Sequence, residues 1–286
     1  MGLLFFLAML SPPSFQEIYQ HAQDAFVKGR FADAVTLLAG LPEEESRRAA
    51  PYNLRALALS ELGRYDEALA ASRRACELDP ANANYVYNEG LIYIAKADFR
   101  QAELTLRAAL VHAPRSALLL IGLSESLIKL NRFDEAEESL NRAAAISPRN
   151  GSVYVALARL YYSLGDGGKL GAAASRAITL EPKNSRACFY YGTWLLDYQH
   201  QEEAGAQSIR KSIDLEPRFV DGLKTWGRIV SHEGRWIEAV HVYETAASVD
   251  SRDDQVFYLL SVAYRKVGQE QKANWALAQY RKLRKP

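Results

Sequence analysis

Residues that could catalyse a reaction are present in this sequence, but their spacing does not assemble them into a site. The histidines are scattered without the spacing of metal ligands, at His21, His112, His200, His232 and His241. Cys76 and Cys188 lie more than 100 residues apart and outside any Cys/His cluster. No nucleophile elbow, HExxH or Rossmann pattern occurs. We therefore expect a protein that is not an enzyme and that needs no metal or cofactor.

One glycine-rich run, residues 164–169 with the sequence LGDGGK, invites comparison with a phosphate-binding loop. Such a loop follows a strand and continues with Ser or Thr after the lysine, because that hydroxyl holds the magnesium ion. Here no strand is predicted before the run, and Leu170 follows Lys169. The run therefore does not predict a nucleotide site, and we expect no small-molecule substrate.

The composition is that of an ordered protein without a strong global charge. Of the 286 residues, 49% are hydrophobic and 24% are charged, which is enough apolar material for a sizeable core. The 35 basic and 34 acidic side chains leave a formal net charge of +1. This balance gives no field that would attract a phosphate backbone. Nucleic acid is therefore not expected as a partner.

The N-terminal segment, residues 1–14, is set apart from the rest of the chain. Its first ten residues, MGLLFFLAML, are nearly all apolar, and the helix-stopping residues SPPS follow them. The stretch is too short to span a bilayer. It is similar to the apolar part of a secretory signal, yet no Lys or Arg precedes it and no small-x-small cleavage pattern follows. A signal remnant, a misassigned start and a capping helix all stay open, and so does the choice between a cytoplasmic and an exported protein.

A pattern with a spacing of 34 residues runs along almost the whole chain. In residues 49–82, 83–116 and 117–150, apolar or aromatic residues stand at positions 4, 11 and 17, a small residue at 8, alanine at 20 and 27, and proline at 32. Positions 4, 8 and 11 share one helical face, as do positions 20, 24 and 27. Glycine at position 15 and proline at 32 end the two helices. Each segment is therefore predicted to contain two helices and two turns.

These markers resemble the tetratricopeptide repeat family. The resemblance implies an all-α fold, an α-α superhelix in which about eight helix-turn-helix repeats stack into a right-handed solenoid. We expect no strand and a single array over residues 15–286. The predicted repeats are 15–48, 49–82, 83–116, 117–150, 151–184, 185–219, 220–253 and 254–286.

Two departures from the pattern fall in the middle of the predicted array. The fifth repeat has Gly167 where an aromatic residue is expected and Leu170 where a small one is expected. The sixth repeat is one residue longer, in the turn around Gln199 to Glu203. We expect a softer junction here, between repeats 1–4 and repeats 6–8.

The functional surface is expected on the first helix of each repeat. In the family that this sequence resembles, positions 2, 5, 9 and 12 of these helices line the concave surface, and here fifteen of the thirty-two are apolar and larger than alanine. The outward positions of the second helices have four such residues: Leu104, Val111, Ile237 and Trp275. An apolar strip typically marks a binding surface. The alternatives are that curvature buries part of the strip or that the N-terminal segment covers it.

The strip predicts a groove for a protein segment, either an extended peptide or an amphipathic helix. It is most apolar in repeats 3 and 4 and becomes basic further along, which would suit a ligand with apolar anchors at one end and acidic residues at the other. The predicted groove residues are Tyr19, Phe26, Leu57, Tyr87, Asn88, Leu91, Ile94, Leu118, Ile121, Ile128, Arg159, Tyr162, Arg186 and Phe189.

Some tetratricopeptide proteins bind the acidic C-termini of chaperones through a clamp of Lys, Asn, Asn, Lys and Arg. Asn88 stands at the central asparagine position of that clamp. Its other positions carry Asn53, Leu57, Leu118 and Gly122 in the neighbouring repeats, where basic and amide residues should stand. The comparison with the family therefore disfavours chaperone docking of this type.

The sequence thus predicts a non-catalytic protein-protein interaction scaffold. The alternative is a non-catalytic tetratricopeptide portion, or an accessory subunit, of a larger enzyme or transferase assembly. The repeats leave only the first fourteen residues outside them, which is too few for an appended catalytic domain. The last residues end a basic helix, so that repeat 8 caps itself, the array is part of a longer one, or arrays associate end to end. The fold does not identify the partner.

Overall fold

The computed structural model describes residues 14–41 and 47–284. The predicted N-terminal segment 1–14 lies outside the described residues, apart from Ser14. The Ser14 side chain accepts a hydrogen bond from the backbone N–H of Glu17 (3.3 Å), and the Glu17 carboxylate accepts one from the backbone N–H of Ser14 (2.8 Å). This capping box satisfies two backbone donors that the helix leaves unpaired, and it fixes the start of the first helix.

These described residues form sixteen α-helices and no strand, which confirms the predicted all-α solenoid class with eight helix pairs. The helices are α1 (Phe15–Val27), α2 (Phe31–Ala39), α3 (Ala49–Glu61), α4 (Tyr65–Leu78), α5 (Ala83–Ala95), α6 (Phe99–His112), α7 (Ala117–Lys129), α8 (Phe133–Ile146), α9 (Gly151–Leu164), α10 (Gly167–Leu180), α11 (Ser185–Asp197), α12 (Glu202–Leu215), α13 (Val220–His232), α14 (Trp236–Val249), α15 (Asp254–Lys266) and α16 (Glu270–Leu283).

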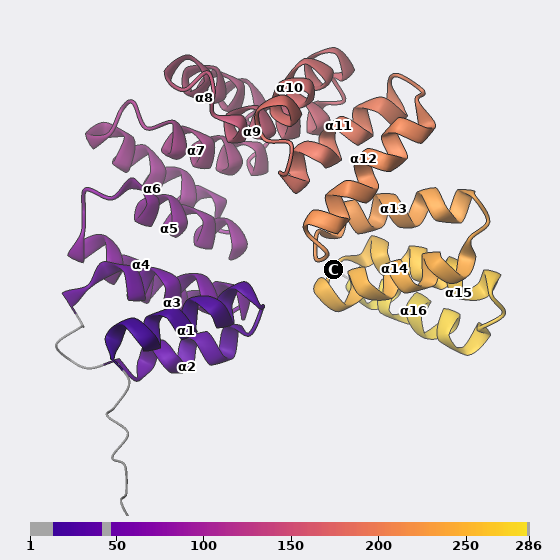
Figure 1. The fold of residues 1–286 in the computed structure, drawn as a ribbon, viewed down its shortest axis with the longest axis horizontal. Helices are drawn as coiled ribbons and strands as arrows, with labels where there is room; N and C mark the ends of the chain where they lie inside the picture. The colour runs from indigo at the N-terminus through magenta and orange to yellow at the C-terminus, as the bar shows by residue number, and fades with distance from the viewer. Residues whose placement is uncertain (1–13, 42–46, 285–286) are drawn as a thin grey trace, which may run out of the picture. The chain divides into compact units, whose positions relative to one another are not determined.

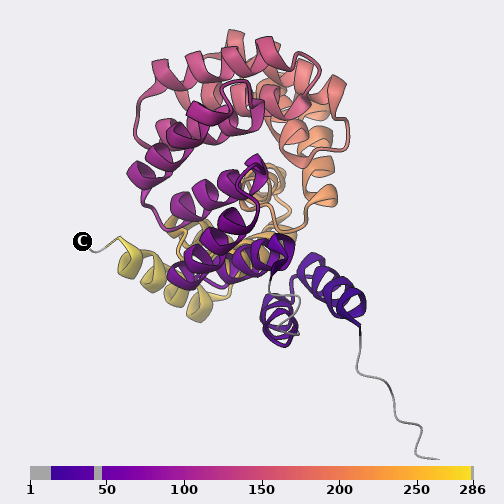
Figure 2. The ribbon, with the colours of Figure 1, turned by 90° about the vertical axis from the view of Figure 1, so that its left-hand side faces the viewer.

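Consecutive helices pair, α1 with α2 and so on, and Figures 1 and 2 show the two helices of a pair side by side and antiparallel. Five of the turns within pairs use a glycine with positive φ: Gly29, Gly63, Gly165, Gly234 and Gly268. Glycine suits this left-handed backbone because it has no Cβ to clash. In the remaining three, Ala97, Asn131 and His200 take the same conformation. The turn between α11 and α12 spans residues 198–201 and is longer than the others.

Small residues let the two helices of a pair approach closely. At position 20 of the predicted repeats, near the start of each second helix, the alanines are 0% exposed: Ala34, Ala68, Ala102, Ala136, Ala239 and Ala273. Two glycines allow a close approach between α11 and α12, where a Cβ added to Gly192 would lie 3.0 Å from the carbonyl oxygen of Gly205. The residues that the sequence marks as small are therefore the ones between which the helices pack.

The described chain forms two compact units. Unit 1 extends to Ile146 and contains α1–α8, and unit 2 begins at Ser147 and contains α9–α16. Within each unit, the second helix of a pair packs against the first helix of the next pair. In unit 1, α5 also contacts both α3 and α7, and in unit 2, α9 contacts α11. The division falls at the end of the fourth predicted repeat, ahead of the irregular residues 165–205 where the sequence placed a softer junction.

Candidate functional site

Part of the predicted strip in unit 1 is covered by the chain itself. Ile121 on α7 is only 6% exposed. Phe26 and Ile94 pack against the hydrophobic core that α1–α6 share, and Phe26 meets Phe31 edge-on, with ring centroids 5.4 Å apart. The first helices also contact one another, as α5 contacts α3 and α7, so side chains that face the neighbouring first helix are covered by it. Ile121 is thus buried where an exposed residue was expected.

Tyr87 and Asn88 join neighbouring repeats. The ring of Tyr87 lies against Gly122 on α7, where an added Cβ would be 2.9 Å from Cδ2 of the tyrosine. Nδ2 of Asn88 donates a hydrogen bond to Oδ1 of Asn53 on α3 (2.8 Å). The Asn88 amide therefore already has a partner within the chain, whereas Tyr87 keeps part of its ring exposed.

The residues that stay partly exposed after this packing come from consecutive first helices. On α1, Tyr19 is stacked on Phe15 with ring centroids 5.7 Å apart. On α3, α5 and α7, five apolar side chains are half-buried, and we call them the unit 1 strip: Leu57, Tyr87, Leu91, Leu118 and Ile128. Because α5 contacts both α3 and α7, the residues of the strip come from three helices that are in contact with one another in sequence order.

In unit 2, the predicted aromatic residues form an internal cluster. Tyr162 on α9 is 41% exposed, and its ring centroid lies 5.9 Å from that of Phe189 and 5.8 Å from that of Tyr190. Phe189 itself is 2% exposed and meets Phe219 edge-on at 5.1 Å. Partial burial raises the pKa of the Tyr162 hydroxyl. Phe189 therefore holds α9, α11 and the start of α13 together, whereas the sequence pattern placed it in an exposed groove.

The basic residues predicted beyond these aromatics are engaged with carboxylates of the same unit. The guanidinium of Arg186 lies 3.2 Å from the carboxylate of Glu216, and the ammonium of Lys224 lies 2.8 Å from that of Asp253. Arg159 is half-buried on α9 and also interacts within the chain. Part of the positive charge that favoured an acidic ligand is thus neutralised internally.

The apolar residues at the outward positions of the second helices are exposed by contrast. Their exposed fractions are Leu104 53%, Val111 77%, Ile237 82% and Trp275 52%. Exposed apolar area is therefore not confined to the first helices. Counting residue types along the sequence does not show this, because it does not show which positions the neighbouring helices cover.

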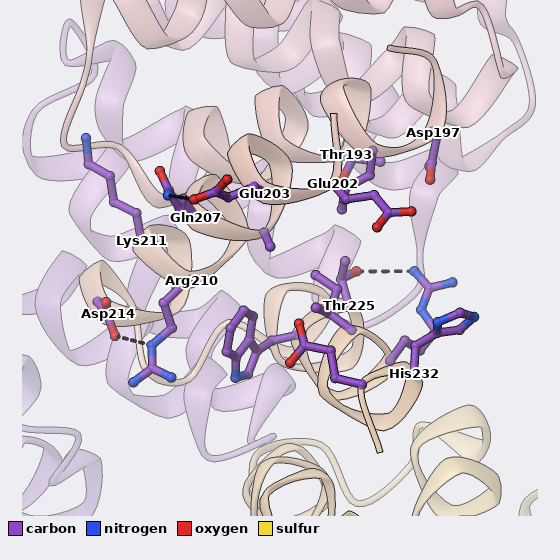
Figure 3. A pocket seen from close by; sticks show the side chains of 16 residues that line it. Thr193, Asp197, Glu202, Glu203, Gln207, Arg210, Lys211, Asp214, Thr225 and His232 are labelled. Carbon is purple, nitrogen blue, oxygen red and sulfur yellow. Dashed lines mark hydrogen bonds and ion pairs between the residues drawn. The ribbon is translucent and has the colours of Figure 1, made fainter. Parts of the chain in front are cut away.

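A cleft of about 870 Å³ lies within unit 2, between α11, α12 and α13 (Figure 3). Leu196 on α11 and Ile229 on α13 give it apolar walls, and charged side chains of α12 line one side. The ring of Trp226 is covered by the guanidinium of Arg210, which lies 5.2 Å from the ring centroid. None of the residues that line this cleft is among the groove residues predicted from the sequence.

The preceding junction, between α10 and α11, shows how such a space is filled elsewhere. There the indole of Trp194 covers Gly171, where an added Cβ would be 2.8 Å from Cζ2 of the indole. The ring of Tyr198 covers Gly167, where an added Cβ would be 2.7 Å from Cγ of the tyrosine, and its hydroxyl donates to the carbonyl oxygen of Gly165 (3.0 Å). Tyr198 thus supplies, from the sixth repeat, the aromatic ring that the fifth repeat lacks.

One junction later, none of the four corresponding positions carries a glycine or an aromatic residue. The first and fifth residues of α12 are Glu202 and Ala206, in place of the two covered glycines of α10. Opposite them, Ile229 and Glu233 stand where Trp194 and its companion tyrosine stand one repeat earlier. Neither of these two residues is aromatic, and the cleft lies at this junction. The corresponding signals in the sequence are the longer sixth repeat and the acidic residue where α12 begins.

Two buried threonines also line the cleft. Thr193 of α11 is 4% exposed, and its Oγ1 has no hydrogen-bond partner among the described residues. Thr225 of α13 is 7% exposed, and its Oγ1 accepts a hydrogen bond from Arg228 (3.4 Å). Buried hydroxyls are normally satisfied, so an unpaired one beside a cleft indicates a place where a bound group can be held.

The described residues show no arrangement typical of metal-dependent or thiol chemistry. They contain no group of three or more His, Cys, Asp or Glu side chains that could hold a metal ion. Burial raises the pKa of the Cys76 thiol to about 12, and it also raises the pKa of Cys188. A thiol with a raised pKa is a weak nucleophile at neutral pH. None of the helices in this part of the chain is long and apolar enough to cross a membrane.

Two family models match the sequence. Residues 56–96 match a model described as a TPR repeat, and residues 87–151 match one described as a tetratricopeptide repeat. The matched residues 56–151 are therefore tetratricopeptide repeats (TPRs). The resemblance predicted from the sequence is thereby confirmed. No curated protein sequence matches the chain.

Solved structures share the fold at low sequence identity. The Cut9 and Hcn1 hetero-tetramer of APC/C gives a TM-score of 0.69 at 15% identity, over 95% of this chain and 53% of the other. Yeast Tom70 gives 0.60 at 17% identity, over 96% and 58% of the two chains. Pseudomonas aeruginosa pilF gives 0.57 at 20% identity, over 70% and 91%. This chain thus spans about half of the first of these structures. The TPR fold and these neighbours support a protein-interaction scaffold in general terms.

Proposed function

We propose that this TPR protein is a non-catalytic scaffold that binds a protein segment along the unit 1 strip. The observation that supports this function is the row of half-buried apolar side chains on α3, α5 and α7. Neighbouring helices already restrict their rotamers, as the contact between Tyr87 and Gly122 illustrates. A partner that covers them gains apolar burial and loses little side-chain entropy, which favours affinity.

The strip suits an extended peptide or an amphipathic helix. Its anchors come from three successive first helices, so a ligand that follows the strip meets an apolar contact at each repeat. One solved structure of similar fold is a hetero-tetramer, that of Cut9 and Hcn1, and is thus an assembly of different proteins.

The test is the double variant Leu91→Asp/Leu118→Asp, with Val111→Asp as the matched control. Both strip residues are half-buried, so the aspartates stay accessible to water, whereas an aspartate at the buried Ile121 would destabilise the fold. Val111 is 77% exposed on the second helix α6 and receives the same chemical change. Loss of an apolar anchor at an interface costs roughly 1–3 kcal/mol, so affinity for the partner should fall by at least about tenfold in the double variant.

The parent chain is used to capture partners from its native source, and the captured protein is then purified and titrated against all three chains by calorimetry. Equal helicity by circular dichroism and equal urea midpoints are required first. We expect the double variant to lose affinity and the control to keep it. Loss in the control alone would place the site on the second helices, and unchanged affinity in both variants would reject the unit 1 strip as the site.

A further inference from the structure

The cleft of unit 2 has an acidic mouth. Asp197 at the end of α11 and Glu202 and Glu203 at the start of α12 are exposed, and none of the three forms an ion pair with a described residue. Figure 3 shows Asp197 and Glu202 across from Thr225 and His232 of α13, whereas the Glu203 carboxylate lies beside Gln207. Carboxylates without cationic partners, such as Asp197 and Glu202, attract a positively charged group.

The cations in the same lining do not cancel this charge. Carboxylates outnumber Lys and Arg side chains in the lining by five to three. Arg210 is already engaged, since its guanidinium lies 3.2 Å from the carboxylate of Asp214 and stacks over Trp226. Arg228 donates to the hydroxyl of Thr225. Asp214 is paired with Arg210 and Glu233 with Arg235, which leaves Asp197, Glu202 and Glu203 against Lys211 and Arg228, so the uncompensated charge of the lining is negative by one.

The interior of the cleft complements the stem of a long side chain. Leu196, Ala206 and Ile229 offer apolar surface, and the unpaired hydroxyl of Thr193 lies beneath them. Lysine and arginine combine an apolar stem with a cationic head, and they bury the stem while the head stays near polar groups. The volume of about 870 Å³ falls within the range of roughly 300–1,000 Å³ that is typical of ligand sites.

We propose that this cleft is a second binding site, which takes a lysine or arginine side chain of a partner protein segment. The apolar stem of this side chain packs between Leu196 and Ile229, and its cationic head pairs with Asp197 and Glu202. An acidic segment is excluded by the same carboxylates. The site lies wholly within unit 2, and it does not depend on the unit 1 strip.

Synthetic peptides of ten uncharged residues with a single central Lys, Arg, Glu or Leu serve as the probe. Binding to the full chain is measured by fluorescence anisotropy. We expect the Lys or Arg peptides to bind at least about tenfold more tightly than the Glu peptide, because the cation gains and the anion loses electrostatic energy at the mouth. Tighter binding of the Glu or the Leu peptide, or no binding of any peptide, would overturn the proposal.

Variants then locate the site. Ile229→Trp places at the cleft the residue type that fills the preceding junction, and it should abolish binding. Glu202→Gln keeps the shape and removes one charge, so that affinity should fall about threefold to tenfold. Glu138→Gln, at an exposed glutamate of α8 in unit 1, is the matched control and should change nothing. If Ile229→Trp does not fold, Glu202→Gln decides, and an unchanged affinity in it refutes the proposal.

The hydroxyl of Thr193 gives an independent readout. Thr193→Val removes an unpaired buried oxygen, so the free protein should become slightly more stable while affinity for the Lys or Arg peptide falls. A fall in stability together with unchanged affinity would remove Thr193 from the site. The double variant Leu91→Asp/Leu118→Asp should bind these peptides normally, which separates this proposal from that for the unit 1 strip.

Discussion

Gly227→Ala tests the packing of α13 against α14. Gly227 stands at position 8 of the seventh repeat, where Ala22, Ala56 and Ala158 stand in other repeats. The repeat pattern by itself therefore predicts that alanine is tolerated. The structure predicts the opposite, because a Cβ on Gly227 would lie 2.6 Å from Cζ of Tyr243, well inside van der Waals contact.

The expected magnitude follows from two opposing effects. An alanine in a helix interior is about 1 kcal/mol more favourable than glycine. An extra carbon in a packed site costs about 1–3 kcal/mol, and the upper end applies here because Tyr243 is only 1% exposed and its ring is rigid. The free energy of unfolding should therefore fall by about 2 kcal/mol.

Urea unfolding followed by circular dichroism measures this change, and hydrogen exchange shows whether it is centred on α13 and α14. Gly168→Ala is the control, because Gly168 is exposed near the start of α10 and the nearest atom to an added Cβ is 3.6 Å away. That variant should be neutral or up to about 1 kcal/mol more stable.

A second variant tests the cause of the loss. Leu106 and Leu140 stand at the position of Tyr243 in other repeats, so Tyr243→Leu removes the ring that an alanine at Gly227 would strike. In the Tyr243→Leu background, the substitution of Gly227 should cost at least about 1 kcal/mol less. If Gly227→Ala stabilises the protein as much as Gly168→Ala does, the steric reasoning is wrong.

The remaining predictions concern two buried glutamates with opposite pKa shifts. Burial alone would raise the pKa of Glu103, but hydrogen bonds from Arg107 (2.8 Å) and Arg132 (2.7 Å) lower it, so its contribution to stability is present above the unfolded value of 4.5 and is lost as the pH falls. Glu103→Gln should therefore cost about 1–3 kcal/mol at pH 7 and much less at pH 3. Burial raises the pKa of Glu89 although Arg73 lies 3.7 Å away. The ionised carboxylate is therefore less favourable in the folded than in the unfolded chain, and the free energy of unfolding falls as the pH rises above 4.5. Glu89→Gln should shift the urea midpoint upward at pH 7, and shifts of the same sign in both variants would contradict this assignment.

The helix pairs could be predicted from the sequence because their determinants are local. The aromatic residue at position 17 begins a second helix, as Phe31 and Tyr65 do, and the alanine three residues later is buried against the first helix. Proline at position 32, as at Pro80, follows the end of the second helix. These signals act within one repeat, and their spacing is enough to place both helices.

The exposure of the candidate sites could not be predicted, because it depends on side chains about 35 residues apart. Whether Ile121 or Phe189 faces solvent is set by how closely one first helix approaches the next, and both are buried. The cleft likewise depends on complementary volumes. Trp194 fills the space over Gly171, but its counterpart Ile229 does not fill the space one repeat later. Periodicity places a residue on a face and does not give the size of its neighbour.

The cover that Tyr198 provides for Gly167 has a consequence for how this array can change by duplication or loss of repeats. The space over a glycine at the start of the second helix is filled only when the following repeat places an aromatic ring there. Deletion of the sixth repeat alone would bring Glu233 to the place of Tyr198 and leave Gly167 uncovered. The fifth and sixth repeats therefore pack as one unit, and a change that removes both of them together leaves neither Gly167 nor its cover behind.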